Sequence, residues 1–360
     1  MGINYYQNTF NLKNLTMFKK KLSALLFLVV LSGCSFTVSK APADGGVYLS
    51  TDKGDKWEQR AYVSPGEKAN VTIGNLNVDR LVTWTPDQNV LYAVSSASGV
   101  WATFNKGGEW KKVFPSPARS VALHPTNRDI FLVGSGNKIY RTLDGGGAWQ
   151  TVYIEGAPET GINDVLIDVA NSETIYAITS RGSLLRSRDG GVSWQAIFRF
   201  TKEVSRLYMS PAGTFYAGMP SRGLWRSDDR GFNWTDLQPN LDAVAKKTGN
   251  FRQFAFVPGT SNAFIYVNSY GLFASPDGGG TWRTIDLVTP PSTVGINTLA
   301  INPLNTNEIF YAINRLVYYS VDGGITWITK AVPSSRLATA LAINLSNPLE
   351  VFLGLTRPAK

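Results

Sequence analysis

Ser50-Thr51-Asp52-Lys53-Gly54-Asp55-Lys56-Trp57 is the first of seven copies of one octapeptide, Ser/Thr-x-Asp-x-Gly-x-x-Trp. The second copy runs from Thr103 to Trp110 and carries Asn105 at the Asp position. The other copies begin at Thr142, Ser187, Ser227, Ser275 and Ser320. Successive Asp positions lie 39 to 53 residues apart, which is the period of one four-stranded blade of a β-propeller. The repeat therefore predicts an all-β propeller.

The octapeptide is expected to be the turn of a hairpin, because a short strand pattern stands on each side of it, as at 138–141 and 150–152. Its Asp can accept backbone N–H bonds, its Ser or Thr hydroxyl adds a local bond, and its Gly tolerates positive φ. Its Trp is expected to pin the turn to the neighbouring hairpin. We assign structural roles to Asp52, Asn105, Asp144, Asp189, Asp229, Asp277, Asp322, Trp57, Trp110, Trp149, Trp194, Trp234, Trp282 and Trp327.

Each repeat also contains a second strand pair, such as residues 119–125 followed by 129–134. The chain opens with an octapeptide hairpin from Val47 to Trp57, and no strand pair precedes it. It closes with a strand pair from Leu337 to Leu355, and no hairpin follows it. Joining the two ends in one sheet completes a blade and removes exposed sheet edges. We therefore expect seven four-stranded blades, with the ring closed by the N- and C-terminal strands.

The octapeptide resembles the Asp-box, or bacterial neuraminidase repeat, over residues 45 to about 357. Asp-boxes occur in sialidases, xyloglucanases, sortilin-type receptor domains and photosystem II assembly factors. In those families the Asp-box turns lie on the outer rim, away from the usual binding face. A single seven-bladed ring with a lipoprotein signal is most similar to lipoproteins of the assembly-factor type and to sortilin-like propeller domains.

Two features separate the chain from the glycan-active members. Sialidases are usually six-bladed and carry an Arg-Ile-Pro segment, which does not occur in this sequence. Xyloglucanase-type enzymes pack two propellers face to face, whereas this chain has repeats for one.

The N-terminal residues resemble a bacterial lipoprotein signal. Lysines near Met17 precede a short apolar run, Leu22 to Leu31, which is too short to span a bilayer. The run ends in Leu31-Ser32-Gly33-Cys34, which resembles a lipobox with Cys34 as the acylated residue. We expect a signal peptide over 1–33, with Met17 the more natural start, a lipid-anchored tether over 34–44 and the propeller over 45–357. The predicted location is the bacterial cell envelope, outside the cytoplasm and attached to a membrane.

The composition excludes several kinds of chemistry. His124 is the only histidine and Cys34 the only cysteine, so a His/Cys metal site and a Cys-His nucleophile are excluded. No metal or cofactor and no nucleic-acid-binding motif is expected. The formal charge is +9, and removing the four lysines before Cys34 lowers it to about +5. Asp164 and Asp168 flank one inner strand, and Asp164 is expected near the central mouth, where an acid partner would be needed for glycoside hydrolysis.

Arginines recur where the inner strands begin. Six residues before the strand-terminal Pro, or before Val169 and Leu345 in the two repeats without it, the chain has Arg80, Arg119, Asn163, Ser205, Arg252, Asn297 and Thr339. Arg206 follows one of these positions, and Arg336 precedes the last inner strand. Strand starts converge on the mouth of a propeller, where arginines can bind carboxylates bidentately. Polar strand ends near solvent are the structural alternative.

These patterns favour a monomeric, non-catalytic propeller that binds a protein or peptide of acidic character. The partner-binding residues of this hypothesis are Arg80, Arg119, Arg206, Arg252 and Arg336. A glycan-active propeller, either a hydrolase of sialidase or xyloglucanase type or a carbohydrate-binding module, is the alternative. Paired acids at the mouth would favour a hydrolase, exposed aromatic side chains would favour glycan binding, and an uninterrupted basic mouth would favour the protein partner.

Overall fold

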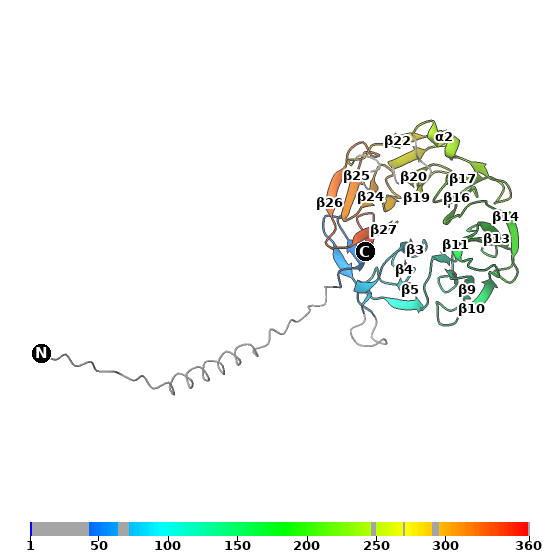
Figure 1. Ribbon diagram of the computed structural model, residues 1–360, viewed down its shortest axis with the longest axis horizontal. Coiled ribbons are helices and arrows are strands. Elements are labelled where there is room, and N and C mark those ends of the chain that lie inside the picture. The colour runs from blue at the N-terminus through cyan, green and yellow to red at the C-terminus, as the bar shows by residue number, and fades with distance from the viewer. Residues whose placement is uncertain (2–42, 64–71, 246–249, 269–270, 290–294, 359–360) are drawn as a thin grey trace. The chain divides into compact units, whose positions relative to one another are not determined.

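The computed structural model describes residues 1, 43–63, 72–245, 250–268, 271–289 and 295–358. Within these residues, 28 strands form seven antiparallel sheets of four strands each. The sheets are arranged radially as blades of a ring (Figure 1). The predicted seven-bladed, all-β propeller is confirmed. Short helices occur at η1 (Ile73–Asn75) and α2 (Gln238–Asp242).

Each blade begins with its innermost strand and ends at the rim of the ring (Figure 1). Blade 1 contains β27 (Leu337–Ile343), β28 (Val351–Thr356), β1 (Gly46–Ser50) and β2 (Glu58–Arg60). Blade 2 contains β3 (Arg80–Thr83), β4 (Leu91–Ser95), β5 (Gly99–Thr103) and β6 (Lys111–Phe114). Blade 3 contains β7 (Ser120–Leu123), β8 (Phe131–Ser135), β9 (Lys138–Thr142) and β10 (Gln150–Ile154). Blade 4 contains β11 (Ile162–Ile167), β12 (Ile175–Thr179), β13 (Ser183–Ser187) and β14 (Gln195–Arg199).

The remaining three blades follow the same order. Blade 5 contains β15 (Arg206–Met209), β16 (Phe215–Met219), β17 (Gly223–Ser227) and β18 (Thr235–Asp236). Blade 6 contains β19 (Phe251–Phe256), β20 (Phe264–Asn268), β21 (Gly271–Ser275) and β22 (Arg283–Ile285). Blade 7 contains β23 (Thr298–Ile301), β24 (Ile309–Ile313), β25 (Leu316–Ser320) and β26 (Ile328–Ala331).

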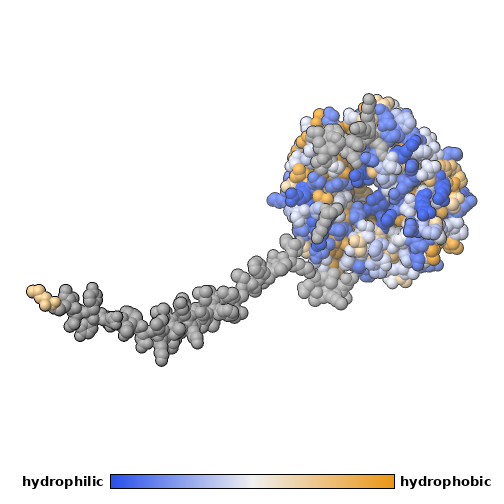
Figure 2. Space-filling model, viewed as in Figure 1, coloured by the Kyte–Doolittle hydropathy of each residue, from blue (hydrophilic) through white to orange (hydrophobic). Residues whose placement is uncertain are grey.

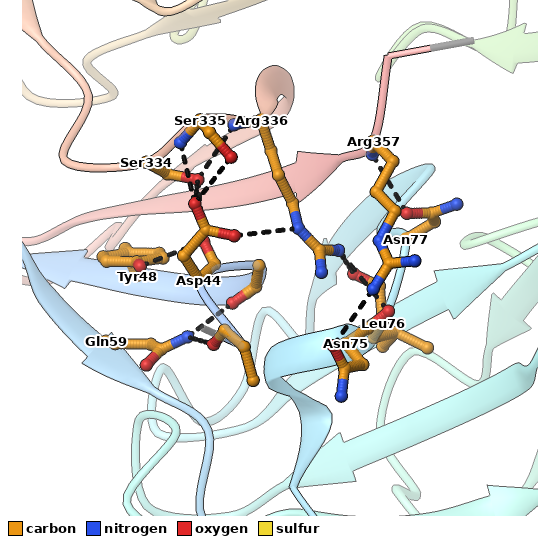
Figure 3. Close-up of polar contacts among 12 residues, drawn as sticks. Asp44, Tyr48, Gln59, Asn75, Leu76, Asn77, Ser334, Ser335, Arg336 and Arg357 are labelled. Atoms are coloured by element: carbon orange, nitrogen blue, oxygen red, sulfur yellow. Dashed lines mark hydrogen bonds and ion pairs between the residues drawn. The ribbon is translucent and has the colours of Figure 1, made fainter. Parts of the chain in front are cut away.

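Blade 1 closes the ring as predicted. β1 pairs with β28 from Gly46 opposite Leu355 to Ser50 opposite Val351. The junction is reinforced by Asp44, just before β1 (Figure 3). Its carboxylate accepts hydrogen bonds from the Ser335 backbone N–H at 2.8 Å and hydroxyl at 2.9 Å, and from Arg336 Nε at 3.3 Å. Burial acts to raise the pKa of Asp44, but the hydrogen bonds from Ser335, Ser334 and Arg336 outweigh it and lower the pKa to about 2.

The hydrophobic core is divided among the blade interfaces. Seven clusters of buried side chains are found in the described residues, each joining two neighbouring blades. Between blades 2 and 3, for example, Tyr92 and Phe131 lie edge to face with ring centroids 5.4 Å apart. Apolar burial on both sides of every blade explains why second strands such as β4 and β24 are buried throughout.

The ring has two distinct faces because neighbouring strands run in opposite directions. The turns after the first and third strands of each blade lie on one face, which therefore carries the octapeptide turns; we call it the octapeptide face. The other face carries the starts of the inner strands and the connections between blades; we call it the mouth face. On the face turned to the viewer in Figure 2, hydrophilic surface borders the centre of the ring.

Candidate functional site

The mouth face is hollowed at its centre by two adjoining cavities of about 220 Å³ and 230 Å³. All seven aligned inner-strand positions line one or both of them: Arg80, Arg119, Asn163, Ser205, Arg252, Asn297 and Thr339. Arg206 lines both. The structure thus brings together Arg80, Arg119, Arg206 and Arg252, four of the five predicted partner-binding arginines. We call this set of cavities the mouth.

Arg80 is held by a buried carboxylate from two blades away. Its Nη1 lies 2.8 Å from Oδ1 of Asp164, a residue that is 5% exposed. The same carboxylate accepts bonds from the Ser120 hydroxyl at 2.7 Å and from the backbone N–H of Leu207 at 3.1 Å. Asp164 therefore ties together blades 2, 3, 4 and 5 and fixes the guanidinium of Arg80 at the wall of the mouth.

Arg119 is held by an amide in the same way. Its Nη1 donates to Oδ1 of Asn163 at 2.7 Å. The Asn163 amide in turn donates to Glu203 Oε1 at 3.0 Å and to the Val204 carbonyl at 2.9 Å. This chain of hydrogen bonds orients Arg119 and links blades 3, 4 and 5.

Arg206 differs from these two arginines. Within the described part of the chain its side chain makes no hydrogen bond or ion pair, although it is only half-exposed and faces both cavities. A guanidinium carries five N–H donors and no acceptor. Arg206 therefore supplies unused donors at the point where the two cavities meet, and the exposed Arg252 lines the cavity beside it.

Arg336 is a correction to the predicted set. It is 2% exposed and lines neither cavity. Its guanidinium bonds Asp44 and the Leu76 carbonyl, as Figure 3 shows, the latter at 3.1 Å. A Cβ at Gly45 would overlap this guanidinium. Burial, together with the nearby Arg357, lowers the pKa of Arg336. Arg336 belongs to the ring closure and is not accessible to a partner.

Sequence reasoning expected Asp164 near the mouth but overlooked two other acidic residues there. Asp79 and Glu203 line it beside the arginines, and the buried Asp164 contacts it through Arg80. Asp79 Oδ2 accepts a bond from the Ser96 backbone N–H at 2.6 Å. The mouth is therefore lined mainly by cationic side chains, but carboxylates interrupt this basic lining. These carboxylates form hydrogen bonds with other parts of the chain. Asp79 directly precedes Arg80, and that adjacency was the available signal for it.

The two acids that the sequence suggested for a hydrolase are separated by the fold. Asp168 follows β11 on the octapeptide face, where it bonds Arg230 and caps its own turn by accepting from the Ala170 N–H. His124 occupies the equivalent place in blade 3 and accepts from the Asn127 N–H at 3.1 Å. At the mouth, both oxygens of Asp164 are engaged as described above. Asp164 and Asp168 therefore cannot act as a pair.

The octapeptide turns share one geometry in all seven copies. In the fourth copy, the Ser187 hydroxyl bonds Asp189 at 2.7 Å and accepts the Gly191 N–H at 2.8 Å, while Asp189 accepts the Ser193 N–H at 2.9 Å. Hydrogen bonds of this kind, chiefly from Ser193, Asn233 and Thr326, lower the pKa of Asp189, Asp229 and Asp322 to about 2. These carboxylates are used within their own turns.

Four octapeptide tryptophans join neighbouring blades through their indole N–H, whereas Trp234 and Trp282 donate to a glycine carbonyl of their own turn. Trp110, Trp149, Trp194 and Trp327 each donate their indole N–H to a backbone carbonyl of the preceding blade, at 2.8–3.1 Å. Trp110 is fully buried. Their contacts are consistent with structural roles.

Several predictions concern residues outside those described. Cys34, the signal peptide and most of the tether lie there. No helix in the described segments is long and apolar enough to cross a membrane. The same segments contain no group of three or more His, Cys, Asp or Glu residues placed to hold a metal ion.

Comparison with known proteins identifies the fold. The family model of sortilin (neurotensin receptor 3) matches residues 98–210, and a search of curated proteins gave no match. A structure titled YCF48 bound to D1 peptide is 17% identical, with a TM-score of 0.60, and the match covers 78% of this chain and 94% of that one. YCF48 from Cyanidioschyzon merolae is 16% identical, with a TM-score of 0.60 over 77% and 95% of the two chains. This chain has the same propeller fold.

A glycoside hydrolase is equally similar in fold. The GH74 xyloglucanase from Xanthomonas campestris is 15% identical, with a TM-score of 0.63 over 78% of this chain. The match spans about half of the enzyme, 51% of its length. The fold is therefore common to a peptide-bound protein and an enzyme, and the residues of the mouth must distinguish between the two functions.

Proposed function

We propose that this protein is a non-catalytic propeller that binds a protein or peptide segment of acidic character at the mouth. The observation that carries the proposal is Arg206, whose guanidinium has no partner among the described residues, lies between two cavities and is flanked by Arg80, Arg119 and Arg252. A carboxylate is the natural partner of such donors because it accepts two parallel N–H bonds. One propeller of similar fold is known as YCF48 bound to D1 peptide, which supports a peptide as the class of partner.

The arrangement is preorganised. Asp164 and Asn163 fix Arg80 and Arg119 before any partner arrives, so little side-chain freedom is lost on binding. Arg206 supplies the adaptable contact, and Arg252 adds a further cation at the wall of the same cavity. Glycoside hydrolysis needs two available carboxyl groups, one acting as an acid. Asp164 is engaged by Arg80, Ser120 and Leu207, and the two acids that line the mouth, Asp79 and Glu203, accept bonds from Ser96 and Asn163.

The test is direct binding of synthetic peptides to the full chain. The probe is a labelled twelve-residue Gly/Ser peptide carrying two Asp residues, compared with the same peptide carrying Asn. We expect the Asp peptide to bind more tightly, and an Arg206→Ala/Arg252→Ala variant to weaken it by about tenfold or more, since charge-assisted bonds contribute about 1.5–3 kcal/mol each. Arg188→Ala is the matched control, because Arg188 is exposed on the octapeptide face.

Two outcomes would overturn the proposal. Equal affinity for the Asp and Asn peptides would contradict the proposal that the partner is acidic. Cleavage of xyloglucan or of a sialoside by the wild-type protein, lost on substitution of Asp79 or Glu203, would establish the glycan-active alternative.

We also propose that Cys34 carries a lipid that holds the propeller at a membrane in the cell envelope. The lipobox-like Leu31 to Cys34 and the preceding apolar run support this. Attachment to a surface raises the effective concentration of the mouth toward partners on that surface. The test is Cys34→Ala: the variant should leave the membrane fraction, and unchanged membrane association would contradict the lipid anchor.

A further inference from the structure

A third cavity lies on the mouth face, farther from the centre, between blades 4 and 5. Its volume is about 180 Å³. The apolar side chains that line it are Phe198, Phe200, Met219 and Trp225. The exposed residues Arg199, Thr201, Lys202 and Arg222 surround them. We call this cavity the side notch.

The side notch has the character of a pocket for one apolar side chain. Phe200 and Met219 are buried in the cluster that joins blades 4 and 5, so the floor is rigid. Phe198 and Trp225 are only partly buried and pack against that cluster. Sites for drug-sized ligands occupy about 300–1,000 Å³, and the side notch is smaller, which suits a single Leu- or Phe-sized group.

The side notch is connected to the mouth through one short stretch of chain. Phe198 to Lys202 line the side notch, and Glu203, Ser205 and Arg206 line the mouth. Lys202 and Arg206 are four residues apart, which in extended chain is at most about 14 Å. A peptide lying along this connection therefore spans both cavities with about four of its own residues.

The charges around the side notch fit an acidic peptide. Arg199, Lys202 and Arg222 surround its apolar floor. Arg222 forms an ion pair with Asp236, with its Nη2 3.3 Å from Oδ2. Arg199 has only a 3.4 Å bond to the Ser183 hydroxyl within the described residues. Cations along the edge favour a segment of negative charge and place it over the apolar floor.

We propose that the site is bipartite: the mouth binds a carboxylate of the partner segment, and the side notch binds an apolar side chain about four residues away. The inference rests on the proposed function and adds to it a sequence preference, an acidic and an apolar residue at fixed spacing. Two linked contacts reinforce each other because the second is made within one complex.

The experiment uses the full chain and three labelled peptides in a common Gly/Ser background. The first carries two Asp residues, the second carries a single Phe, and the third carries both, with Phe four residues from the nearer Asp. We expect the combined peptide to bind about tenfold more tightly than the Asp peptide, as burial of an aromatic group predicts. Phe198→Ala should abolish that gain and leave the affinity for the Asp peptide unchanged.

Tyr153→Ala is the matched control. Tyr153 occupies the equivalent place on β10 of blade 3 and packs on Trp194, as Phe198 packs on Trp234 of the next blade. It lines neither the mouth nor the side notch. The control should keep the full gain from Phe, which separates a lost contact from a general loosening of the blade edge.

The outcomes separate the two proposals. Equal binding of the Asp and combined peptides to wild type would overturn the proposal that the side notch binds an apolar side chain. The mouth would remain as the proposed site. Loss of Asp-peptide binding in Phe198→Ala would also overturn the proposal for the side notch, since the residue would then act on the whole fold. Binding of the Phe peptide alone, without any affinity for Asp, would overturn the acidic partner and with it the bipartite site.

Discussion

The octapeptide face and the mouth face are built from the same seven repeats, yet their polar residues differ in kind. On the octapeptide face, every copy places a hydroxyl, an Asp or Asn and a glycine N–H in the same three bonds, as Thr103, Asn105 and Gly107 do. On the mouth face, the seven equivalent inner-strand positions hold four residue types: Arg, Asn, Ser and Thr. The repeat is uniform where it closes turns and variable where it borders the central cavities. Variation on a rigid scaffold is typical of a binding surface.

The largest loss of stability is expected when the closing blade, on which both faces depend, is left incomplete. Ending the chain before Leu337 removes β27 and β28, so β1 keeps only β2 as a partner and two interblade clusters lose the buried side chains of β27 and β28. Each buried side chain contributes about 1.5–3 kcal/mol, and the sum exceeds a typical stability of about 5–15 kcal/mol. The truncated protein should show no cooperative unfolding by circular dichroism. A chain ending at Arg357 is the control, and a cooperative transition in the shorter form would contradict closure.

Two arginines of the mouth are expected to separate stability from binding. Arg80→Ala leaves the buried Asp164 without its cation and should lower the unfolding free energy by about 3 kcal/mol. Arg206→Ala removes no bond within the described residues and should change it by less than about 0.5 kcal/mol. Urea unfolding of the two variants measures the contrast. Equal losses would show that Arg206 is structural and would weaken its assignment to a partner.

Falling pH should weaken the turns of the octapeptide face. The folded-state pKa of Asp322 is about 2, below the usual 3.8, so the unfolded chain binds the proton first as pH falls. The contribution of Asp322 is therefore complete above about pH 4 and is lost progressively toward pH 2. Asp322→Asn, which imitates Asn105, should fold and show a shallower loss of stability between pH 4 and 2. Urea midpoints at several pH values test this, and an unchanged slope would show that Asp322 does not titrate as inferred.

The smallest change in stability is expected at the residue that follows the Asp or Asn of the octapeptide. Lys106 has φ of 57°, in a region that glycine adopts more readily, and its amino group bonds Glu350 of blade 1 at 2.8 Å. Lys106→Ala loses the partly exposed ion pair and should cost about 0.5 kcal/mol. Lys106→Gly loses the same pair but relieves the backbone, so it should be at least as stable as Lys106→Ala. Thermal unfolding of both variants decides the order, and a less stable glycine variant would contradict it.

Much of this architecture could be predicted from the sequence because the repeat encodes it locally. The octapeptides define the hairpins, and the unmatched halves at Val47 and Leu337 define the closing blade. Aligning the inner strands also placed Arg80, Arg119 and Arg252 at one opening. These inferences need only spacing and alternation.

The pairings between blades could not be predicted in the same way. Arg80 and Asp164 are 84 residues apart, and no repeat spacing states which carboxylate a guanidinium will reach. Arg336 was assigned to the mouth because it precedes an inner strand, yet it lies three residues before the aligned position, Thr339, and bonds Asp44 instead. The side notch depends on side chains from two blades, such as Phe198 and Trp225, and has no motif of its own.

The pairing of Gly46 with Leu355 has a consequence in time. During synthesis the first octapeptide hairpin emerges early, but the strand that completes its sheet is among the last residues made. Blades 2 to 7 have all their strands beforehand, whereas blade 1 must wait for the whole chain. Until then the edge of β1 that pairs with β28 stays uncovered, and so do the faces of blades 2 and 7 that contact blade 1. Exposed strand edges are prone to pair with other chains. The pairing of the final strands, β27 and β28, with β1 is thus the folding step that ends the nascent chain's exposure to aggregation.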